Sequence, residues 1–210
     1  MREIMRTLQS AVPDVGRWWP GESRFEILVG AILTQNTAWT NVQMALQNLR
    51  SASLLDADRL LRASEDVVQQ AIRPSGYWRT KTRYVKALAQ WFIRYDADVA
   101  QWDDDELRAS LLAVRGVGEE TADDILLYAY RRGVFIFDAY GRRLLNAAGW
   151  GNYSTYSQAR HACWATIREE AFSVDEYALL HGLIVQAGKE ARAAGGWDVY
   201  WPAALQHAAI

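Results

Sequence analysis

Two glycines and a later aspartate are the residues of this chain whose types and spacing suggest chemistry. Residues 111–138 read LLAVRGVGEETADDILLYAYRRGVFIFD. Gly116 and Gly118 allow backbone angles that other residues resist, and a tight turn here leaves N–H groups unpaired where the next helix begins. Such N–H groups bind anions, and a nucleic-acid backbone is a polyanion that a protein can hold without reading sequence. We therefore predict that Gly116, Gly118 and Thr121 contact a DNA phosphate.

The elements around the hairpin are predicted to be helical almost throughout. Ser23 and Glu26 form a capping-box pattern, which begins an apolar helix that runs to Leu33. Residues 134–137 have the composition of a strand, but a strand this short and isolated cannot build a sheet. We therefore predict an all-α fold. The hairpin is expected at 107–130, and the other helices at 41–49, 64–72, 79–93, 103–114, 139–148 and 176–194.

The hairpin and its flanks resemble the helix-hairpin-helix DNA glycosylases, the superfamily that includes endonuclease III. The hairpin reads VRGVGEETA, and Asp138 stands where that family has its essential aspartate. The resemblance covers most of the chain. Other segments resemble one branch, the 3-methyladenine DNA glycosylase III type, which lacks an iron–sulfur cluster; they are WWP at 18–20, RFEILVGAILTQNTAW at 24–39, IRPSGYWRTK at 72–81 and HGLIVQAGK at 181–189.

The resemblance also implies a domain organisation. It predicts two helical lobes with a DNA-binding cleft, and it places Asp138 and the hairpin at that cleft. One lobe is expected to consist of residues 24–132, and the other of residues 1–23 together with 133–210.

Asp138 is predicted to be catalytic. Breaking an N-glycosidic bond develops positive charge on the sugar, and a fixed carboxylate can stabilise that charge and orient or deprotonate the attacking water. An aspartate before residues 139–148 is also a good helix cap, and the two roles are compatible because a capping carboxylate is held rigidly. Glu120 stands where lyase-active members of the superfamily carry a lysine. Because a carboxylate cannot form a Schiff base, we expect water to be the nucleophile and strand cleavage to be inefficient.

Aromatic residues and one lysine are expected to form the base pocket. The chain has 10 tryptophans, and Trp18, Trp19 and Trp39 match aromatic pocket positions of the branch, which has phenylalanine where Trp39 stands. An N-alkylated purine is cationic, so an aromatic face attracts it; ordinary packing is the alternative for each ring. Lys189 matches a pocket lysine of the branch that can be carbamylated, and an exposed late-helix lysine is the alternative. The aromatic residues of the tail 195–210 have no counterpart in the branch, and we expect them to pack on the protein surface.

Base removal requires the nucleotide to leave the stack, and two residues are predicted to fill the gap. Gln35, within LTQNT, matches a family residue that enters the space left by the flipped base. Tyr77 matches the position of a wedge on the opposite strand, where an aromatic ring can stack. The alternatives are a polar residue at a helix end for Gln35 and a core position for Tyr77.

The charge distribution favours a local DNA track although the formal net charge is −2. Residues 73–94 carry several bases and no acid, and a second basic group surrounds Asp138. From these groups we predict phosphate contacts by Arg79, Lys81 and Arg142. An ordinary solvated helix face is the alternative for individual side chains.

Composition excludes several classes of protein. Cys163 is the single cysteine, so an internal disulfide and a cysteine-ligated cluster are excluded, and the three histidines lack metal-ligand spacing. With the resemblance, we expect a monovalent cation at the hairpin carbonyls, and otherwise no metal, no iron–sulfur cluster and no cofactor. No apolar run is long enough to span a membrane, and the opening MREIMRTLQSAV does not look like a signal peptide. We therefore expect a soluble, cytoplasmic monomer that associates with the nucleoid through DNA.

These residues favour a monofunctional DNA glycosylase of base excision repair. Its expected substrate is damaged double-stranded DNA that carries alkylated purines, 3-methyladenine above all. An endonuclease III-like glycosylase with weak abasic-site lyase activity is one alternative, and Glu120 argues against it. A non-catalytic hairpin DNA-binding module is the other. Asp138 argues against that alternative, because a hairpin that only binds phosphate needs no such aspartate.

Overall fold

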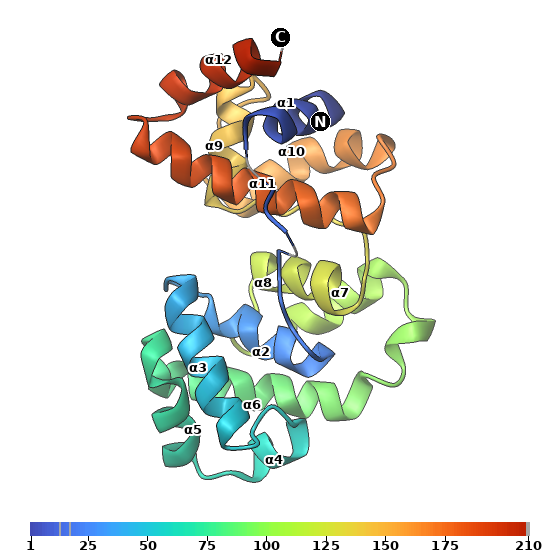
Figure 1. The fold of residues 1–210 in the computed structure, drawn as a ribbon. Coiled ribbons are helices and arrows are strands. Elements are labelled where there is room, and N and C mark those ends of the chain that lie inside the picture. The colour runs from blue at the N-terminus through green and yellow to red at the C-terminus, as the bar shows by residue number, and fades with distance from the viewer. Residues whose placement is uncertain (13, 17, 209–210) are drawn as a thin grey trace. The chain divides into compact units, whose positions relative to one another are not determined.

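A computed structural model of this protein describes residues 1–12, 14–16 and 18–208. Figure 1 shows helices joined by loops and turns along the whole described part of the chain. No strand occurs within these residues, so the all-α prediction is confirmed.

The chain forms two compact units, one made of a single continuous segment and the other of two separate segments. The middle unit is the continuous segment Gly21–Arg131, and the terminal unit combines Met1–Pro20 with Arg132–Ile210. These bounds lie within a few residues of the two lobes expected from the sequence.

The middle unit is built around a single buried helix. Its elements are α2 (Arg24–Leu33), α3 (Trp39–Ser51), α4 (Ala57–Arg62), α5 (Glu65–Ile72), η1 (Arg73–Ser75), α6 (Trp78–Tyr95), η2 (Val99–Gln101), α7 (Asp104–Leu112), α8 (Glu119–Asp124) and the π-helical η3 (Ile125–Ala129). The Ser23 hydroxyl accepts a hydrogen bond from the Glu26 amide at 3.1 Å, which begins α2 as the capping pattern predicts. Every residue from Phe25 to Leu33 is buried, because α2 is apolar on nearly all sides and packs against α3, α6 and η3.

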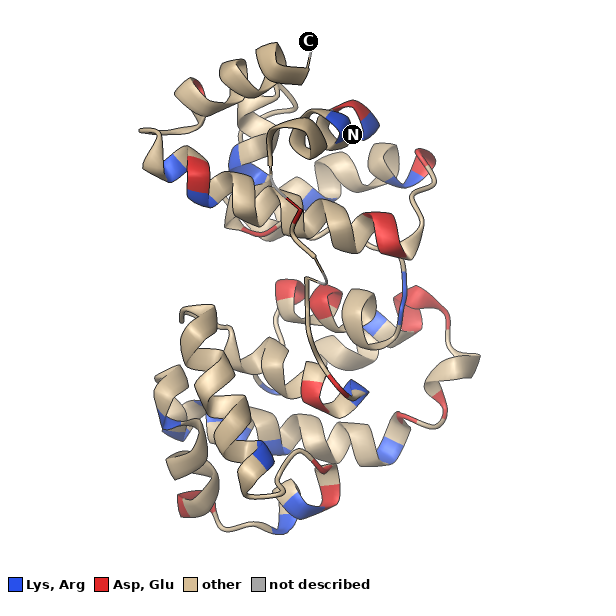
Figure 2. Cartoon of the chain, viewed as in Figure 1, with Lys and Arg blue, Asp and Glu red and all other residues tan. Residues whose placement is uncertain are grey.

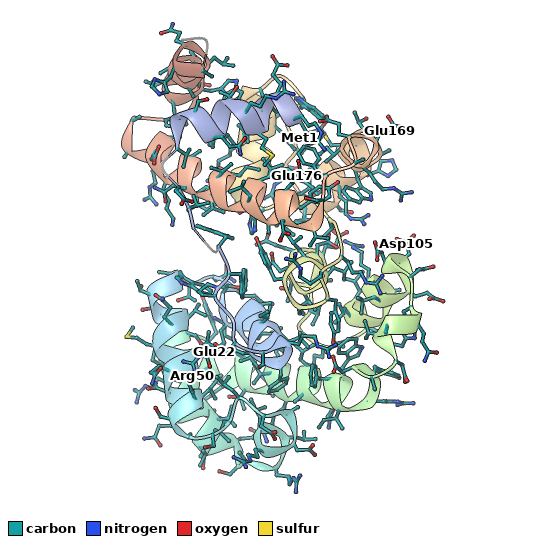
Figure 3. All side chains as sticks on the ribbon, turned by 45° about the vertical axis from the view of Figure 1, so that its right-hand side comes forward. Met1, Glu22, Arg50, Asp105, Glu169 and Glu176 are labelled. Atoms are coloured by element: carbon teal, nitrogen blue, oxygen red, sulfur yellow. The ribbon has the colours of Figure 1, made fainter. Side chains whose placement is uncertain are left out.

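One ion pair reinforces the contact between α2 and α3. The Glu26 carboxylate is 4% exposed and lies 2.6 Å from Nη2 of Arg50. The exposed Glu22 carboxylate is 3.7 Å from Nε of the same arginine, and Figure 3 labels Glu22 and Arg50. The buried carboxylate needs this partner, since an unpaired buried charge is costly.

Helices α7 and α8 form the predicted hairpin, with bounds that differ from expectation. Asp103 caps α7, which ends at Leu112 instead of continuing to 114. Gly116 has a φ of +93°, a left-handed conformation that glycine adopts without steric cost. Gly118 is the N-cap of α8, and the helix then widens into the π-helix η3 instead of continuing as an α-helix.

The terminal unit joins the first helix of the chain to its last third. It contains α1 (Arg2–Ala11), α9 (Ala139–Ala147), α10 (Tyr156–Glu169), α11 (Val174–Ala193) and α12 (Trp197–Ala208). Helix α1 packs against α11 and α12, and α11 packs against α9 and α12. The amine of Met1 lies 2.6 Å from the Glu170 carboxylate, and Arg2 lies 2.7 Å from Glu176; Met1 and Glu176 are labelled in Figure 3.

The aromatic tail of the chain forms α12, which the sequence pattern did not predict. Trp201 is only 7% exposed, and the hydroxyl of Tyr200 donates a 2.9 Å hydrogen bond to the Glu190 carboxylate on α11. The expectation that the tail packs on the surface is therefore corrected for Trp201, which belongs to the core of the terminal unit.

Candidate functional site

Asp138 is the N-cap of α9, and its carboxylate is almost entirely buried. Oδ1 accepts a 2.6 Å hydrogen bond from the Gly141 amide, and the residue is 8% exposed. A Cβ at position 141 would lie 3.0 Å from the carbonyl oxygen of Ile136, so glycine lets the helix begin close to the carboxylate. Asp138 is therefore a rigid carboxylate in the terminal unit.

Arg142 supports the backbone next to this carboxylate. Its Nη1 donates a 2.8 Å hydrogen bond to the carbonyl oxygen of Phe137, the residue that precedes Asp138. This hydrogen bond occupies one N–H group of the guanidinium. The guanidinium has other N–H groups, and a contact between them and a DNA phosphate stays a prediction.

Trp18, His181 and Lys189 lie together in the terminal unit. Nζ of Lys189 is 5.5 Å from the centroid of the Trp18 ring, and the His181 ring meets that ring edge-on with centroids 6.2 Å apart. Gly182 makes room for the indole, since a Cβ there would lie 3.0 Å from it. Nε2 of His181 is 4.0 Å from Oδ2 of Asp138. The structure thus brings two predicted pocket residues near the predicted catalytic carboxylate, with His181 between them.

His181 lies next to the predicted catalytic carboxylate, although it was not among the predicted site residues. Burial lowers the pKa of His181 from 6.5 to about 4, so the imidazole is neutral at neutral pH. Its 4.0 Å approach to Asp138 is then neither an ion pair nor a hydrogen bond. The available signal was its place about two turns before Lys189 on one predicted helix.

The buried imidazole predicts a pH-dependent stability. Between pH 6.5 and about 4 the unfolded chain binds a proton at His181 and the folded chain does not, so stability falls as the pH falls through this window. The full effect is about 3 kcal/mol. We expect denaturant unfolding of the wild type to show this loss and His181→Asn to flatten it. The matched control is His161→Asn, at an exposed histidine of α10, which should leave the slope unchanged. Equal slopes in wild type and His181→Asn would contradict a neutral, buried imidazole.

Gln35 contacts the hairpin turn in the middle unit. Its Nε2 donates to the carbonyl oxygen of Gly116 at 2.9 Å and to Oγ1 of Thr121 at 3.0 Å. Thr121 is 5% exposed and its hydroxyl oxygen accepts the bond from Gln35. The Tyr84 ring packs so closely against Gly116 that a Cβ at this position would overlap it. Phosphate contacts by Gly116, Gly118 and Thr121 stay a prediction.

Arg108 holds the two helices of the hairpin together. Its Nε is 2.6 Å from the carboxylate of Asp123, and its Nη2 is 3.2 Å from that of Glu119. Asp123 is fully buried, so this pair fixes α7 against α8. Glu120, by contrast, is exposed, and neither glutamate offers an amine at this place.

Tyr77 projects into solvent immediately before α6. It is 70% exposed, and its φ of +47° is unusual for a residue other than glycine. Its exposure excludes the alternative of a core position. The wedge role of Tyr77 stays a prediction.

Among the basic residues at 73–94, the lysines bind main-chain carbonyls and the arginines are exposed. Lys81 and Lys86 each donate to two main-chain carbonyl oxygens, and Lys81 is 2% exposed. This burial corrects the prediction that the Lys81 ammonium contacts phosphate. Figure 2 colours the basic residues of α6 blue. The exposed basic residues of this segment are Arg73 in η1 and Arg79, Arg83 and Arg94 in α6. A phosphate contact by Arg79 therefore stays a prediction.

Two further predicted pocket residues lie in different units. Trp39 is the first residue of α3 and belongs to the middle unit, whereas Trp19 follows Trp18 in the terminal unit. Both side chains are partly buried. Their roles in a base pocket stay predictions.

Within 1–12, 14–16 and 18–208, no group of three or more histidine, cysteine, aspartate or glutamate side chains is placed to hold a metal ion. Cys163 is buried. None of the helices in this part of the chain is both long and apolar enough to cross a membrane.

Comparison with known sequences supports the resemblance. Residues 29–169 match the family described as HhH-GPD superfamily base excision DNA repair protein. A provisionally named DNA repair glycosylase of Methanocaldococcus jannaschii is 38% identical over 179 residues, which cover 82% of this chain and 80% of that protein. Endonuclease III of Sulfolobus acidocaldarius is 27% identical over 168 residues, which cover 79% of this chain and 73% of the relative.

Solved structures share the fold. The crystal structure of H. pylori 3-methyladenine DNA glycosylase bound to 1,N6-ethenoadenine matches with a TM-score of 0.76 and 27% identity, covering 90% of this chain and 96% of that one. A non-covalent endonuclease III–DNA complex matches with a TM-score of 0.70, covering 88% and 82% of the two chains, and at 17% identity it shows the fold alone. The chain therefore belongs to the HhH-GPD superfamily of base excision DNA repair proteins and has an endonuclease III-like fold.

Proposed function

We propose that this protein is a monofunctional DNA glycosylase that hydrolyses the N-glycosidic bond of alkylated purines, 3-methyladenine above all, in damaged double-stranded DNA. The observation that carries the proposal is the Asp138 carboxylate, which is nearly buried and fixed by the Gly141 amide. A fixed carboxylate with little water around it stabilises positive charge on the sugar more strongly than a solvated one.

Water is the nucleophile in this proposal. The Asp138 carboxylate is held in place through Oδ1 by the Gly141 amide, and we assign this carboxylate to orienting or deprotonating the water. An alkylated purine is cationic and leaves as a neutral base, so a strong general acid is unnecessary. The neutral His181 is consistent with a site that donates no proton to the leaving group.

The wall formed by Trp18 and Lys189 supports a cationic base as the substrate. The indole already has the Lys189 ammonium 5.5 Å from its centroid, so its face is placed to attract positive charge. A free ammonium would repel a cationic purine, whereas a carbamate on Lys189 would attract it. The structural similarity to H. pylori 3-methyladenine DNA glycosylase supports the same substrate class.

The distribution of lysines supports the absence of lyase activity. The chain has lysines only at 81, 86 and 189. The ammonium groups of Lys81 and Lys86 each bind two carbonyl oxygens within the middle unit, which leaves Lys189, beside Trp18, as the lysine of the terminal unit. The α-amine of Met1 is paired with Glu170, so Lys189 is the amine that we would assign to Schiff-base chemistry if any occurred. We further propose that the protein acts as a monomer without an iron–sulfur cluster, with a monovalent cation at the hairpin carbonyls.

We expect release of free base from alkylated duplexes without strand cleavage, and no covalent adduct when borohydride is present during turnover. The substrates are methylated duplex DNA and duplexes that carry 1,N6-ethenoadenine, an oxidised pyrimidine or an abasic site. Released base and nicked strand are measured separately, with Lys189→Gln in parallel. An efficient adduct that disappears in Lys189→Gln would replace this proposal with the lyase alternative. Binding to all duplexes without release of any base would favour the non-catalytic module.

A further inference from the structure

The Lys81 ammonium is buried at a junction between two loops of the middle unit. Nζ donates hydrogen bonds to the carbonyl oxygen of Leu33 at 2.9 Å and to that of Ser75 at 2.7 Å. Lys81 is 2% exposed, and Ser75 is fully buried. An ammonium is costly to bury unless its hydrogen-bonding partners compensate for the lost water, so these two contacts are what stabilise it here.

The two carbonyls belong to the last residues of two helices, and each helix is followed by a residue predicted to fill the gap. Leu33 is the last residue of α2, and Gln35 follows it by two positions. Ser75 is the last residue of η1, and Tyr77 also follows by two positions. One cation therefore joins the base of the loop that carries Gln35 to the base of the loop that carries Tyr77.

The Tyr77 loop is held in a conformation that needs outside support. Gly76 and Tyr77 both have left-handed backbone angles, with φ of +69° and +47°. Such a conformation is unfavourable for tyrosine and persists where the surrounding structure determines it. The Ser75 hydroxyl donates a 2.7 Å hydrogen bond to the carbonyl of Ile72, and the amide of Lys81 donates a 2.9 Å bond to the carbonyl of Tyr77. Lys81 thus supports the loop through both its side chain and its main chain.

The Gln35 loop is held from its other side by the hairpin. Nε2 of Gln35 donates to the carbonyl of Gly116 and to Oγ1 of Thr121. The contacts therefore continue from the Tyr77 loop through Lys81 and the end of α2 to the hairpin. All of these residues lie within the middle unit.

We infer that Lys81 is a positioning residue that sets the spacing between Gln35 and Tyr77, the two residues predicted to fill the gap left by an extruded nucleotide. This inference rests on the proposed function. Burial lowers the pKa of Lys81 to about 8, so the amine is still largely protonated at neutral pH. The charged form is the stronger hydrogen-bond donor to the two carbonyl oxygens. Lys81 does not touch DNA or the reacting atoms in this role, and it acts through the two loops.

The chain offers a matched control for Lys81 on the same helix. Lys86 also belongs to α6, and its ammonium also donates to two carbonyl oxygens, those of Leu61 and Ala63, at 2.9 and 2.5 Å. These carbonyls lie at the end of α4 and not beside either gap-filling residue. Lys81→Met and Lys86→Met thus remove the same kind of contact from the same helix, and only the first affects the proposed spacing.

The experiment compares excision of a lesion that is base-paired with excision of the same lesion when it is unpaired. Lys81→Met should reduce single-turnover release of an alkylated purine from a paired duplex roughly 10- to 100-fold. The loss should be much smaller when the lesion lies opposite an abasic analogue, because that base is already unpaired and costs less to extrude. Lys86→Met should reduce both rates equally or not at all. Lys81→Arg, which keeps a cation and several donors, should recover part of the paired-duplex rate.

Two further measurements separate failure of this inference from failure of the proposed function. Tyr77→Ala and Gln35→Ala should show the same selective loss on paired duplex as Lys81→Met. If they do and Lys81→Met behaves like Lys86→Met, the positioning role is wrong while the glycosylase proposal stands. If the wild type releases no base, amide hydrogen exchange still tests the contact. Faster exchange at 34–37 and 75–80 in Lys81→Met, but not in Lys86→Met, supports it, and unchanged exchange overturns it.

Discussion

Asp138→Asn is expected to lower base release by at least about 100-fold while leaving the affinity for damaged duplex nearly unchanged. Asparagine keeps the side-chain oxygen that accepts the Gly141 amide at 2.6 Å, so α9 should begin at the same residue. The substitution removes only the negative charge that stabilises the sugar and activates water. Single-turnover release and equilibrium binding to the same lesion-containing duplex measure the two quantities.

Asp56→Asn is the matched control for this substitution. Asp56 is also the N-cap of a helix, accepts the Arg59 amide at 2.9 Å, and is exposed at the start of α4. It should leave base release and binding unchanged. If Asp138→Asn keeps most of its activity, Asp138 is a cap without a catalytic role, and the lesion is hydrolysed by another group.

Gly116→Ala is expected to destabilise the protein by about 3 kcal/mol or more, the sum of a backbone cost and a packing cost. Alanine pays about 1–2 kcal/mol in a left-handed conformation, and Gly116 has a φ of +93°. Its Cβ would also overlap Cγ of Tyr84, and overpacking of this kind typically costs about 1–3 kcal/mol. Cγ is the ring atom nearest the backbone, so the tyrosine cannot avoid the methyl group by a small movement of its tip. Thermal or urea unfolding measures the loss.

The second glycine of the hairpin provides the control. A Cβ added at Gly118 would meet no heavy atom within 4 Å, and Gly118 is not among the glycines with positive φ. Gly118→Ala should therefore change stability little, although it tests whether the phosphate contact tolerates a side chain. Tyr84→Ala should recover part of the loss in the Gly116→Ala background, because the ring that overlaps the methyl group is gone. Equal stability of the two alanine variants would show that the turn relaxes at little cost.

The Asp138 cap and the hairpin were predictable from the sequence because their determinants are local. A capping carboxylate needs only an amide three residues later, and the Gly141 amide supplies it. The turn needs a residue that tolerates a positive φ, which Gly116 provides. The family resemblance, now confirmed, rests on the order of such local motifs along the chain. The predicted roles of the pocket and gap-filling residues remain for the experiments above.

The surroundings of these motifs were decided by the tertiary structure. Nζ of Lys81 reaches the carbonyl of Leu33, 48 residues away, and nothing in a run of basic residues distinguishes this inward-facing lysine from the exposed Arg79. His181 loses its charge at neutral pH because packing buries it, and Trp201 enters the core because α12 packs against α1. Local spacing determines where a helix begins and which residues share its face. Solvent exclusion and the partner of each polar group depend on segments that are distant in sequence, so only the folded chain determines them.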